Sequence, residues 1–204
     1  MADNLAAALR LMLVTDDRLI EGRDLVAVAC AAERGGATSV QLRLKQASPR
    51  ELTAAARALI TALRIPVLVN DRPDVAIAAG AAGVHVGAED LAVALVRRIA
   101  PPDFFVGASV GSAEEATGAA EADYWGVGPW RATATKADAG AALGVDGFAA
   151  IVSLSGGVPC IAVGGVQPED VAAVRAAGGA GVAVAGGILT ADDIETAVRR
   201  YARG

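Results

Sequence analysis

Short runs of apolar, often β-branched residues recur along the chain, separated by alanine-rich segments. Segments such as DLVAVACAAERGG and PRELTAAARALITALR place apolar residues at helical spacing and leave a charged outer face. The runs are LMLVT (11–15), SVQLR (39–43), PVLVN (66–70), GVHVG (83–87), FFVGAS (104–109), YWGVGP (124–129), PCIAVGG (159–165) and GVAVAGG (181–187). The pattern predicts eight strands that alternate with helices.

Turn and cap residues fall where these helices should begin and end. The stretches RGGAT, AAGAAG and AAGGAG place glycine just before a predicted strand, and glycine can adopt the left-handed conformation that closes a helix. The stretches SPRE, QPED and TADD place proline or acidic residues at expected helix starts, where they suit the first turn.

Strands that alternate with helices predict a parallel sheet with right-handed crossovers. Eight such strands in 204 residues favour a closed (β/α)8 TIM barrel that occupies residues 1–204 as a single domain. The alternative is an open doubly wound sheet, which has fewer strands and a glycine-rich first turn. The first strand ends in VTDDR and lacks such a turn. The longest expected connection is the loop around residues 130–143.

Composition and charge restrict the classes of partner that the protein can bind. The chain is 54% hydrophobic and 3% aromatic, so small aliphatic side chains must fill its core. Its net charge of -5, with no basic stripe, argues against nucleic-acid or membrane binding. Cys30 and Cys160 fall in a predicted helix and strand, which favours reduced core thiols and a cytoplasmic location. The N-terminus lacks the pattern of a signal peptide, and glycine and proline interrupt the long uncharged stretch from Gly147 to Pro168. The sequence leaves the oligomeric state open, a homo-oligomer included.

Polar residues and glycines follow the predicted strands, at the end where barrel enzymes carry their active sites. They are Gln41, Arg43 and Lys45; Asn70 and Asp71; Glu89 and Asp90; Ser109; Thr133, Thr135 and Lys136; Gly164 and Gly165; and Gly186 and Gly187.

These residues sort into two kinds of anion site. Arg43, Lys45 and Lys136 are cations, and Asp71 and Asp90 are carboxylates on neighbouring strands. Mg²⁺ is commonly held by one or two carboxylates together with substrate phosphate and water. We therefore expect a magnesium-bridged pyrophosphate at this group. The two glycine pairs after the last strands suggest a second site, where bare backbone N–H groups bind a phosphate.

Each residue also has a structural interpretation. Asn70 and Asp71 are typical turn formers or helix caps, and Ser109 can cap the following helix. Lys136 can be a solvated loop lysine, and the glycine pairs can be plain turns. His85, the sole histidine of the chain, lies in mid-strand, which favours a packed, hydrogen-bonded core residue over a catalytic base.

An ordered set of short motifs resembles the thiamine phosphate synthase family, also called thiamine-phosphate pyrophosphorylase. The motifs are LVTDDR, GGATSVQLRLK, PVLVNDRPDVAIAAGAAGVHVGAED, VGAS, ADYWGVGP, TATK and IAVGGVQPED. The resemblance runs nearly end to end, and the order and spacing of the motifs make it specific.

The resemblance implies a transferase that uses Mg²⁺. An aminopyrimidine pyrophosphate would lose pyrophosphate, and the ring nitrogen of a thiazole phosphate would capture the electron-deficient methylene, giving thiamine phosphate. By position, Asp71 and Asp90 would ligate Mg²⁺. The pyrimidine pyrophosphate would contact Gln41, Arg43, Lys45, Asn70, Ser109 and Lys136, and the thiazole phosphate would contact Thr133, Thr135, Gly165, Gly186 and Gly187. Arg43, Lys45, Asn70 and Lys136 would be the catalytic residues.

Several positions depart from the family pattern. Leu44, Ala88 and Gly186 replace Glu, Gln and Ser, Arg131-Ala132 replaces an aromatic residue and proline, and VGS replaces a threonine-rich segment. These departures keep two alternatives open. One is a thiazole tautomerase of related fold, although Pro129 stands where such proteins carry a histidine. The other is a non-catalytic phosphate-binding barrel.

Overall fold

The computed structural model describes residues 2–132 and 141–204 and confirms the closed barrel. All eight strands are parallel and pair in chain order, and β8 returns to pair with β1. The strands are β1 (Leu11–Val14), β2 (Ser39–Leu42), β3 (Val67–Asn70), β4 (Gly83–Val86), β5 (Phe105–Val110), β6 (Tyr124–Val127), β7 (Cys160–Val163) and β8 (Gly181–Val184). Each lies within or overlaps one predicted run.

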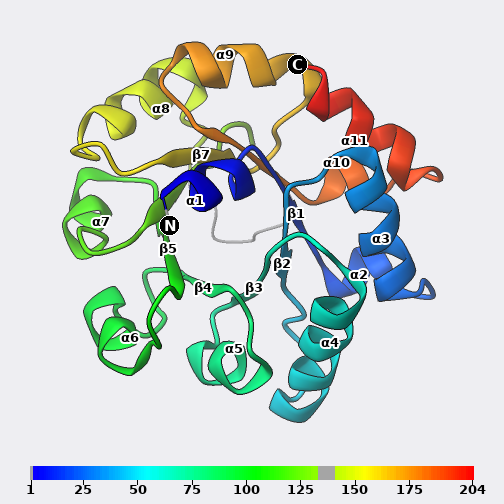
Figure 1. Cartoon of the computed structure of the whole chain (residues 1–204). Helices are drawn as coiled ribbons and strands as arrows, with labels where there is room; N and C mark the ends of the chain where they lie inside the picture. The colour runs from blue at the N-terminus through cyan, green and yellow to red at the C-terminus, as the bar shows by residue number, and fades with distance from the viewer. Residues whose placement is uncertain (1, 133–140) are drawn as a thin grey trace.

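The helices surround the barrel, and all of them except α1 lie in a ring outside the sheet (Figure 1). They are α1 (Ala2–Ala8), α2 (Asp17–Ile20), α3 (Leu25–Gly35), α4 (Pro49–Ala62), α5 (Pro73–Ala79), α6 (Val93–Ile99), α7 (Ala113–Gly118), α8 (Gly144–Ser153), α9 (Val171–Ala176), α10 (Gly186–Leu189) and α11 (Ile194–Ala202), with a 3₁₀ turn η1 (Pro168–Asp170). None of these helices is long and apolar enough to cross a membrane.

The caps agree with the sequence pattern at most helix ends. Ser48 and Glu51 form a reciprocal capping box at the start of α4, where Pro49 occupies the first turn. Gly36 and Gly80 close α3 and α5 in the left-handed conformation. Some apolar runs extend past their strands. The run 159–165 outlasts β7, which ends at Val163, and the run 181–187 outlasts β8, which ends at Val184 before the glycine pair begins the short helix α10.

Two apolar cores lie on the two faces of the sheet. The larger one lies between the strands and the surrounding helices and is rich in Val, Leu and Ala. The smaller one fills the inside of the barrel and consists of Leu9, Met12, Val14, Leu68, Phe105, Tyr124, Ile161 and Ala183. Leu5 of α1 packs against this inner core, and α1 lies across the amino-terminal end of the barrel (Figure 1). The barrel is therefore filled from below and opens toward the carboxyl ends of its strands.

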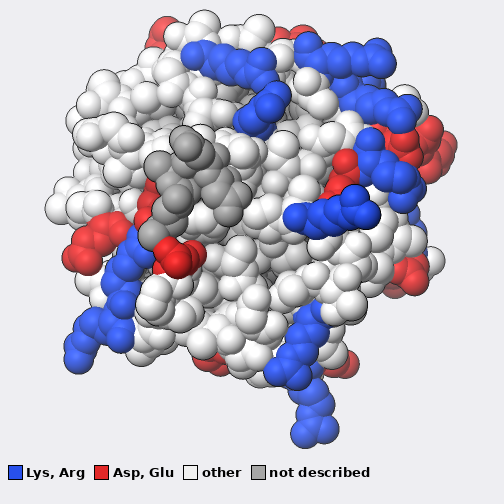
Figure 2. All heavy atoms as spheres, in the orientation of Figure 1, with Lys and Arg blue, Asp and Glu red and all other residues white. Residues whose placement is uncertain are grey.

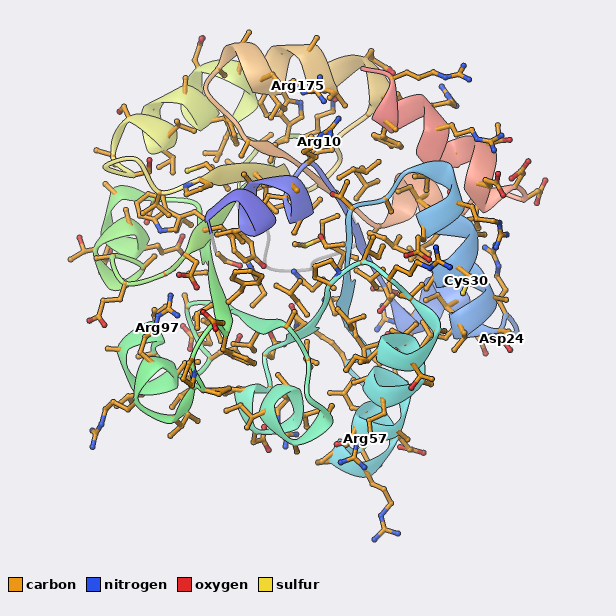
Figure 3. The ribbon with its side chains drawn as sticks, viewed as in Figure 1. Arg10, Asp24, Cys30, Arg57, Arg97 and Arg175 are labelled. Atoms are coloured by element: carbon orange, nitrogen blue, oxygen red, sulfur yellow. The ribbon has the colours of Figure 1, made fainter. Side chains whose placement is uncertain are left out.

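Charged side chains of both signs intersperse over α3 and α11 on the face that carries α1 (Figure 2). The carboxylate of Glu195 on α11 pairs with Arg34 on α3 and with Arg199 one turn further along α11. Arg97 belongs to α6 (Figure 3), and its guanidinium pairs at 2.7 Å with Asp123, which directly precedes β6. These contacts tie the outer helices to their neighbours.

The packing of the inner core predicts that two glycine substitutions differ in their effect on stability. A Cβ atom on Gly107 of β5 would lie 2.1 Å from the Tyr124 ring, whereas one on Gly118 at the end of α7 would meet nothing within 4 Å. We expect Gly107→Ala to lower the free energy of unfolding by about 1–3 kcal/mol through overpacking. Gly118→Ala should leave it unchanged or slightly higher, because alanine favours the helix. Urea denaturation measures both, and equal stabilities would contradict the packing described.

Candidate active site

A cleft of about 820 Å³ opens at the carboxyl ends of the strands, and all eight strands contribute to its lining. The predicted site residues found in this lining are Gln41, Arg43, Lys45, Asn70, Asp71, Asp90, Ser109, Gly165, Gly186 and Gly187. Thr133, Thr135 and Lys136 lie outside the described residues. Residues spread from position 41 to position 187 therefore converge on one cavity.

Two carboxylates face each other on one side of the cleft. Asp71 follows β3 in the left-handed conformation (φ 64°), and its backbone N–H donates to the His85 carbonyl at 2.8 Å. Asp90 is fixed from the next loop, where its Oδ2 accepts a hydrogen bond from the Gly87 N–H at 2.7 Å. Burial and the neighbouring carboxylate of Asp90 raise the pKa of Asp71 to about 6. A carboxylate that is partly buried beside a second carboxylate favours a cation at this position.

This pair suits a magnesium ion that is also bound by substrate and water better than a metal ion held by protein ligands alone. Among residues 2–132 and 141–204, no cluster of three or more His, Cys, Asp or Glu side chains could hold a metal. Mg²⁺ keeps several waters and takes one or two carboxylates plus phosphate oxygens. Asp71 and Asp90 supply the carboxylates, and the cleft leaves room for the other ligands.

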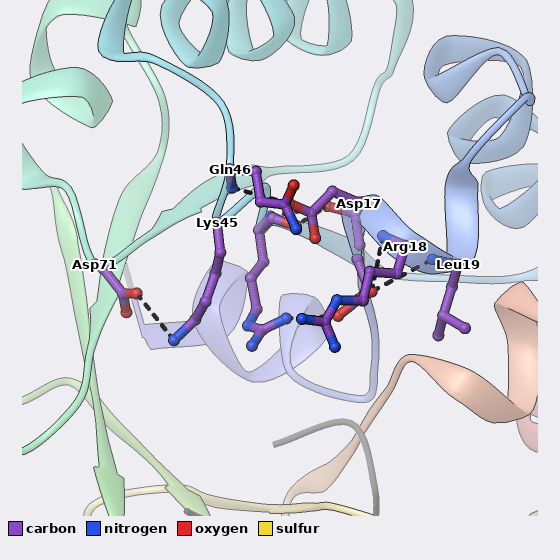
Figure 4. A network of polar contacts seen from close by, with 9 residues as sticks. Asp17, Arg18, Leu19, Lys45, Gln46 and Asp71 are labelled. Carbon is purple, nitrogen blue, oxygen red and sulfur yellow. Dashed lines mark hydrogen bonds and ion pairs between the residues drawn. The ribbon is translucent and has the colours of Figure 1, made fainter. Parts of the chain in front are cut away.

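The cations of the cleft have carboxylate partners of their own. Arg43 Nη1 lies 2.7 Å from Asp16 Oδ2, with both side chains largely buried, and Lys45 Nζ lies 3.9 Å from Asp71 Oδ2. Figure 4 shows the contact between Lys45 and Asp71. Asp16 was not among the predicted site residues, although it follows the first predicted strand directly in VTDDR. Its position at a strand end was the signal that could have identified it.

Polar side chains also form the floor of the cleft. The His85 ring bridges Ser109 and Tyr124, with Nε2 3.0 Å from Ser109 Oγ and Nδ1 3.1 Å from the Tyr124 hydroxyl. Burial raises the pKa of Tyr124, so this phenol stays protonated. His85 is thus buried and hydrogen-bonded, as the core interpretation predicts, while also lining the cleft. The capping interpretation of Ser109 is wrong, because Ser112 caps α7.

The opposite wall consists of backbone from the last strands. Gly165 has a φ of 70°, and a Cβ there would lie 2.9 Å from the Arg131 Cβ. A Cβ on Gly187 would lie 2.1 Å from the Tyr201 hydroxyl, so packing alone requires that glycine. The result is a wall with exposed backbone and few side chains, which suits a phosphate.

Arg131, one of the departures from the family pattern, joins two loops beside this wall. Its guanidinium binds the carboxylate of Asp170 through two contacts of 2.9 and 2.5 Å. Its backbone N–H donates to the Gly164 carbonyl at 2.9 Å. Asp170 also accepts from the Gln167 N–H, and the Arg131 guanidinium holds the pKa of Asp170 below its usual range. Arg131 therefore fixes the loop after β6 against the loop after β7.

Comparison with known proteins agrees with this geometry. The pattern of the thiamine monophosphate synthase family matches residues 11–188. The chain is 47% identical over 196 residues to a thiamine-phosphate synthase of Azorhizobium caulinodans, which covers 94% of this chain and 92% of that relative. It is 44% identical over 196 residues to one of Methanoculleus marisnigri, covering 93% and 92%.

Solved structures give the same picture. The thiamine phosphate pyrophosphorylase of Pyrococcus furiosus superposes with a TM-score of 0.87 at 34% identity, covering 98% of this chain and 96% of that one. A 3-hexulose-6-phosphate synthase superposes with a TM-score of 0.70 at 19% identity over 95% and 98% of the two chains, and shows the fold alone.

The raised pKa of Asp71 predicts a stability cost in the metal-free protein. Its folded pKa of about 6 lies above the ordinary value of 3.8, so the folded state binds more protons between these values and loses stability as pH rises. We expect Asp71→Asn to be more stable than the wild type at pH 8 by roughly 1 kcal/mol, with the gain vanishing below about pH 4. Chemical denaturation across this pH range, with a chelator present, measures the difference.

Asp103 provides the matched control. It has the same left-handed backbone (φ 65°) but is exposed in a loop. Asp103→Asn tests the backbone preference of asparagine without the charge repulsion. If both variants gain equally, or if the gain of Asp71→Asn does not depend on pH, the electrostatic cost assigned to Asp71 is wrong.

Proposed function

Because the chain belongs to the thiamine monophosphate synthase family and is an enzyme of that activity, we propose that its cleft joins an aminopyrimidine pyrophosphate to a thiazole phosphate with the help of Mg²⁺. The observation that carries the proposal is the convergence of Arg43, Lys45, Asn70, Asp71 and Asp90 on one cleft. The Asn70–Asp71 pair within this cleft favours the synthase over the tautomerase and non-catalytic alternatives.

The charged side of the cleft would bind the pyrophosphate. Asp71 and Asp90 would hold Mg²⁺, which supplies positive charge to the phosphate oxygens when bound. Arg43 and Lys45 would neutralise the charge that grows on the leaving group as the bond between the methylene carbon and the pyrophosphate oxygen breaks. Asn70, at the end of β3, would donate an amide N–H to the same substrate.

The floor of the cleft would hold the pyrimidine ring. Gln41 is buried there, and Ser109 is held toward the cavity by its hydrogen bond to His85. The bond between the pyrimidine methylene and the thiazole nitrogen forms from a lone pair, so no side chain has to remove a proton. The floor therefore needs to orient the ring and exclude water, and buried hydrogen-bonding groups do both.

The backbone wall would bind the thiazole phosphate. Gly165, Gly186 and Gly187 bring main-chain groups to the cleft, and as glycines they have no side chains that would block a phosphate. The roles predicted for Thr133, Thr135 and Lys136 on the same side stay predictions. We further propose that the enzyme works in the cytoplasm, in agreement with its free thiols Cys30 and Cys160.

Release of pyrophosphate tests the metal site. We expect wild-type turnover to require Mg²⁺ and to stop with a chelator. Loss of even an outer partner of a metal ligand costs roughly 10- to 100-fold in metal affinity, so Asp71→Asn and Asp90→Asn should raise the Mg²⁺ concentration for half-maximal rate at least that much. Glu89→Gln removes an exposed carboxylate that lines the cleft from the same loop but is not a proposed metal ligand, and it should change this concentration little. No release with both substrates and Mg²⁺ would reject the proposed function.

The Arg131–Asp170 pair predicts an effect confined to one substrate. We expect Arg131→Ala to raise KM for the thiazole phosphate by about tenfold, because the loop beside Gly165 loses its anchor. KM for the pyrimidine pyrophosphate should not change. The control is Arg72→Ala, which removes a similar two-point contact to Asp74 within a single turn. Equal changes in both KM values would contradict a local role for Arg131.

A further inference from the structure

Asp16 has more contacts than a helix cap requires. Its Oδ1 accepts hydrogen bonds from the backbone N–H groups of Arg18 and Leu19 at 3.1 and 3.3 Å, which caps the short helix α2. Its other oxygen, Oδ2, binds Arg43 Nη1 at 2.7 Å. The Asp16 side chain is 8% exposed and that of Arg43 15% exposed, so the pair is shielded from solvent. The backbone of α2 thereby fixes the carboxylate that holds Arg43.

The same loop also fixes the backbone that carries both cations. The Arg43 N–H donates to Thr15 Oγ1 at 2.8 Å, and the Thr15 hydroxyl donates back to the Arg43 carbonyl at 3.2 Å. The Gln46 N–H donates to Asp17 Oδ2 at 2.9 Å (Figure 4). Three consecutive residues after β1 therefore hold the segment from Arg43 to Gln46 at both of its ends.

We propose that Asp16 is a positioning residue for the reaction, which holds the Arg43 guanidinium so that its unoccupied edge faces the leaving pyrophosphate. The inference rests on the proposed function, because it assigns that ligand to Arg43. Within the described residues, the Arg43 side chain hydrogen-bonds to Asp16 alone, and Arg43 lines the cleft. A guanidinium has five N–H donors in a fixed fork, so one edge binds Asp16 while the other stays available to phosphate oxygens.

Charge alone does not explain a carboxylate at this position. A negative group beside an anion site weakens binding of the anion, and a serine or asparagine would cap α2 equally well. Orientation explains it, because a long arginine side chain otherwise samples many rotamers. Donors that are already aimed at developing charge contribute most in the transition state. Asp16 should therefore affect kcat more than substrate binding.

The test uses Asp16→Asn, which keeps the cap and removes the charge that holds Arg43. We expect kcat for pyrophosphate release to fall about 10- to 100-fold, as for other groups that orient a ligand-binding residue. KM for the pyrimidine pyrophosphate should change by a smaller factor than kcat. The Kd for inorganic pyrophosphate with Mg²⁺, measured by calorimetry, should also change by a smaller factor. In an Arg43→Gln background, Asp16→Asn should change kcat by no more than about twofold, because the two residues act as one unit.

Asp24→Asn is the matched control. Asp24 also caps a helix, accepting from the Ala27 N–H at 2.9 Å, and it lies at the outer edge of α3 (Figure 3). We expect its kcat to equal that of the wild type. If thermal melts show Asp16→Asn to be unfolded, Asp16→Ser preserves the cap and should show the same loss of kcat.

Three results would overturn the inference. The first is that Asp16→Asn, or a folded Asp16→Ser, has the kcat of the wild type while Arg43→Gln has a lower kcat. This result would reject the role of Asp16 and leave the proposed function intact. The second is an equal loss from Asp16→Asn in both backgrounds, which shows that the residue does not act through Arg43. The third is full activity of Arg43→Gln, which rejects the ligand assigned to Arg43 and the inference with it.

Discussion

Pairing between β8 and β1 is the contact on which the site depends. Leu11 pairs with Val182 and Leu13 with Val184, which closes the sheet and removes both of its edges. Closure brings the loop after the first strand next to the loops after the last, and all eight strand ends to one opening. Arg43 and Gly187 are far apart in sequence yet line the same cleft because of it.

Closure also places charged side chains in a cleft that is partly shielded from water, and several of these side chains have partners of opposite charge. Arg43 binds Asp16, and Lys45 lies near Asp71, so these two cations each have a carboxylate partner without any substrate. Asp71 also lies beside Asp90, which has the same charge, and burial together with Asp90 raises the pKa of Asp71. A half-buried pair of like charges destabilises the folded state unless a cation joins it. The arrangement is therefore explained by ligand binding and not by folding.

The sequence predicted the architecture well because strand and helix periodicity survive in every repeat unit. It predicted the cleft residues because a closed parallel barrel leaves a single set of strand ends for them. It could not predict contacts that depend on the packing of loops. Arg131 looked like a simple departure from a family pattern until Asp170 was found beside it, and the two are 39 residues apart. Gly187 suggested a phosphate site, but the approach of Tyr201 already requires glycine there.

The two sides of the cleft present different groups to an anion, and their place in the chain explains why. The loops after β1 to β4 are short and carry charged side chains, which can meet a leaving group whose charge grows during the reaction. The loops after β7 and β8 present main chain, which gives a fixed field suited to a phosphate whose charge stays constant. The floor between them is a hydrogen-bonded chain from Ser109 through His85 to Tyr124, in which His85 and the Tyr124 phenol are buried. The proposed reaction fits this division, because negative charge grows on the pyrophosphate at the charged side and stays constant on the thiazole phosphate at the backbone side.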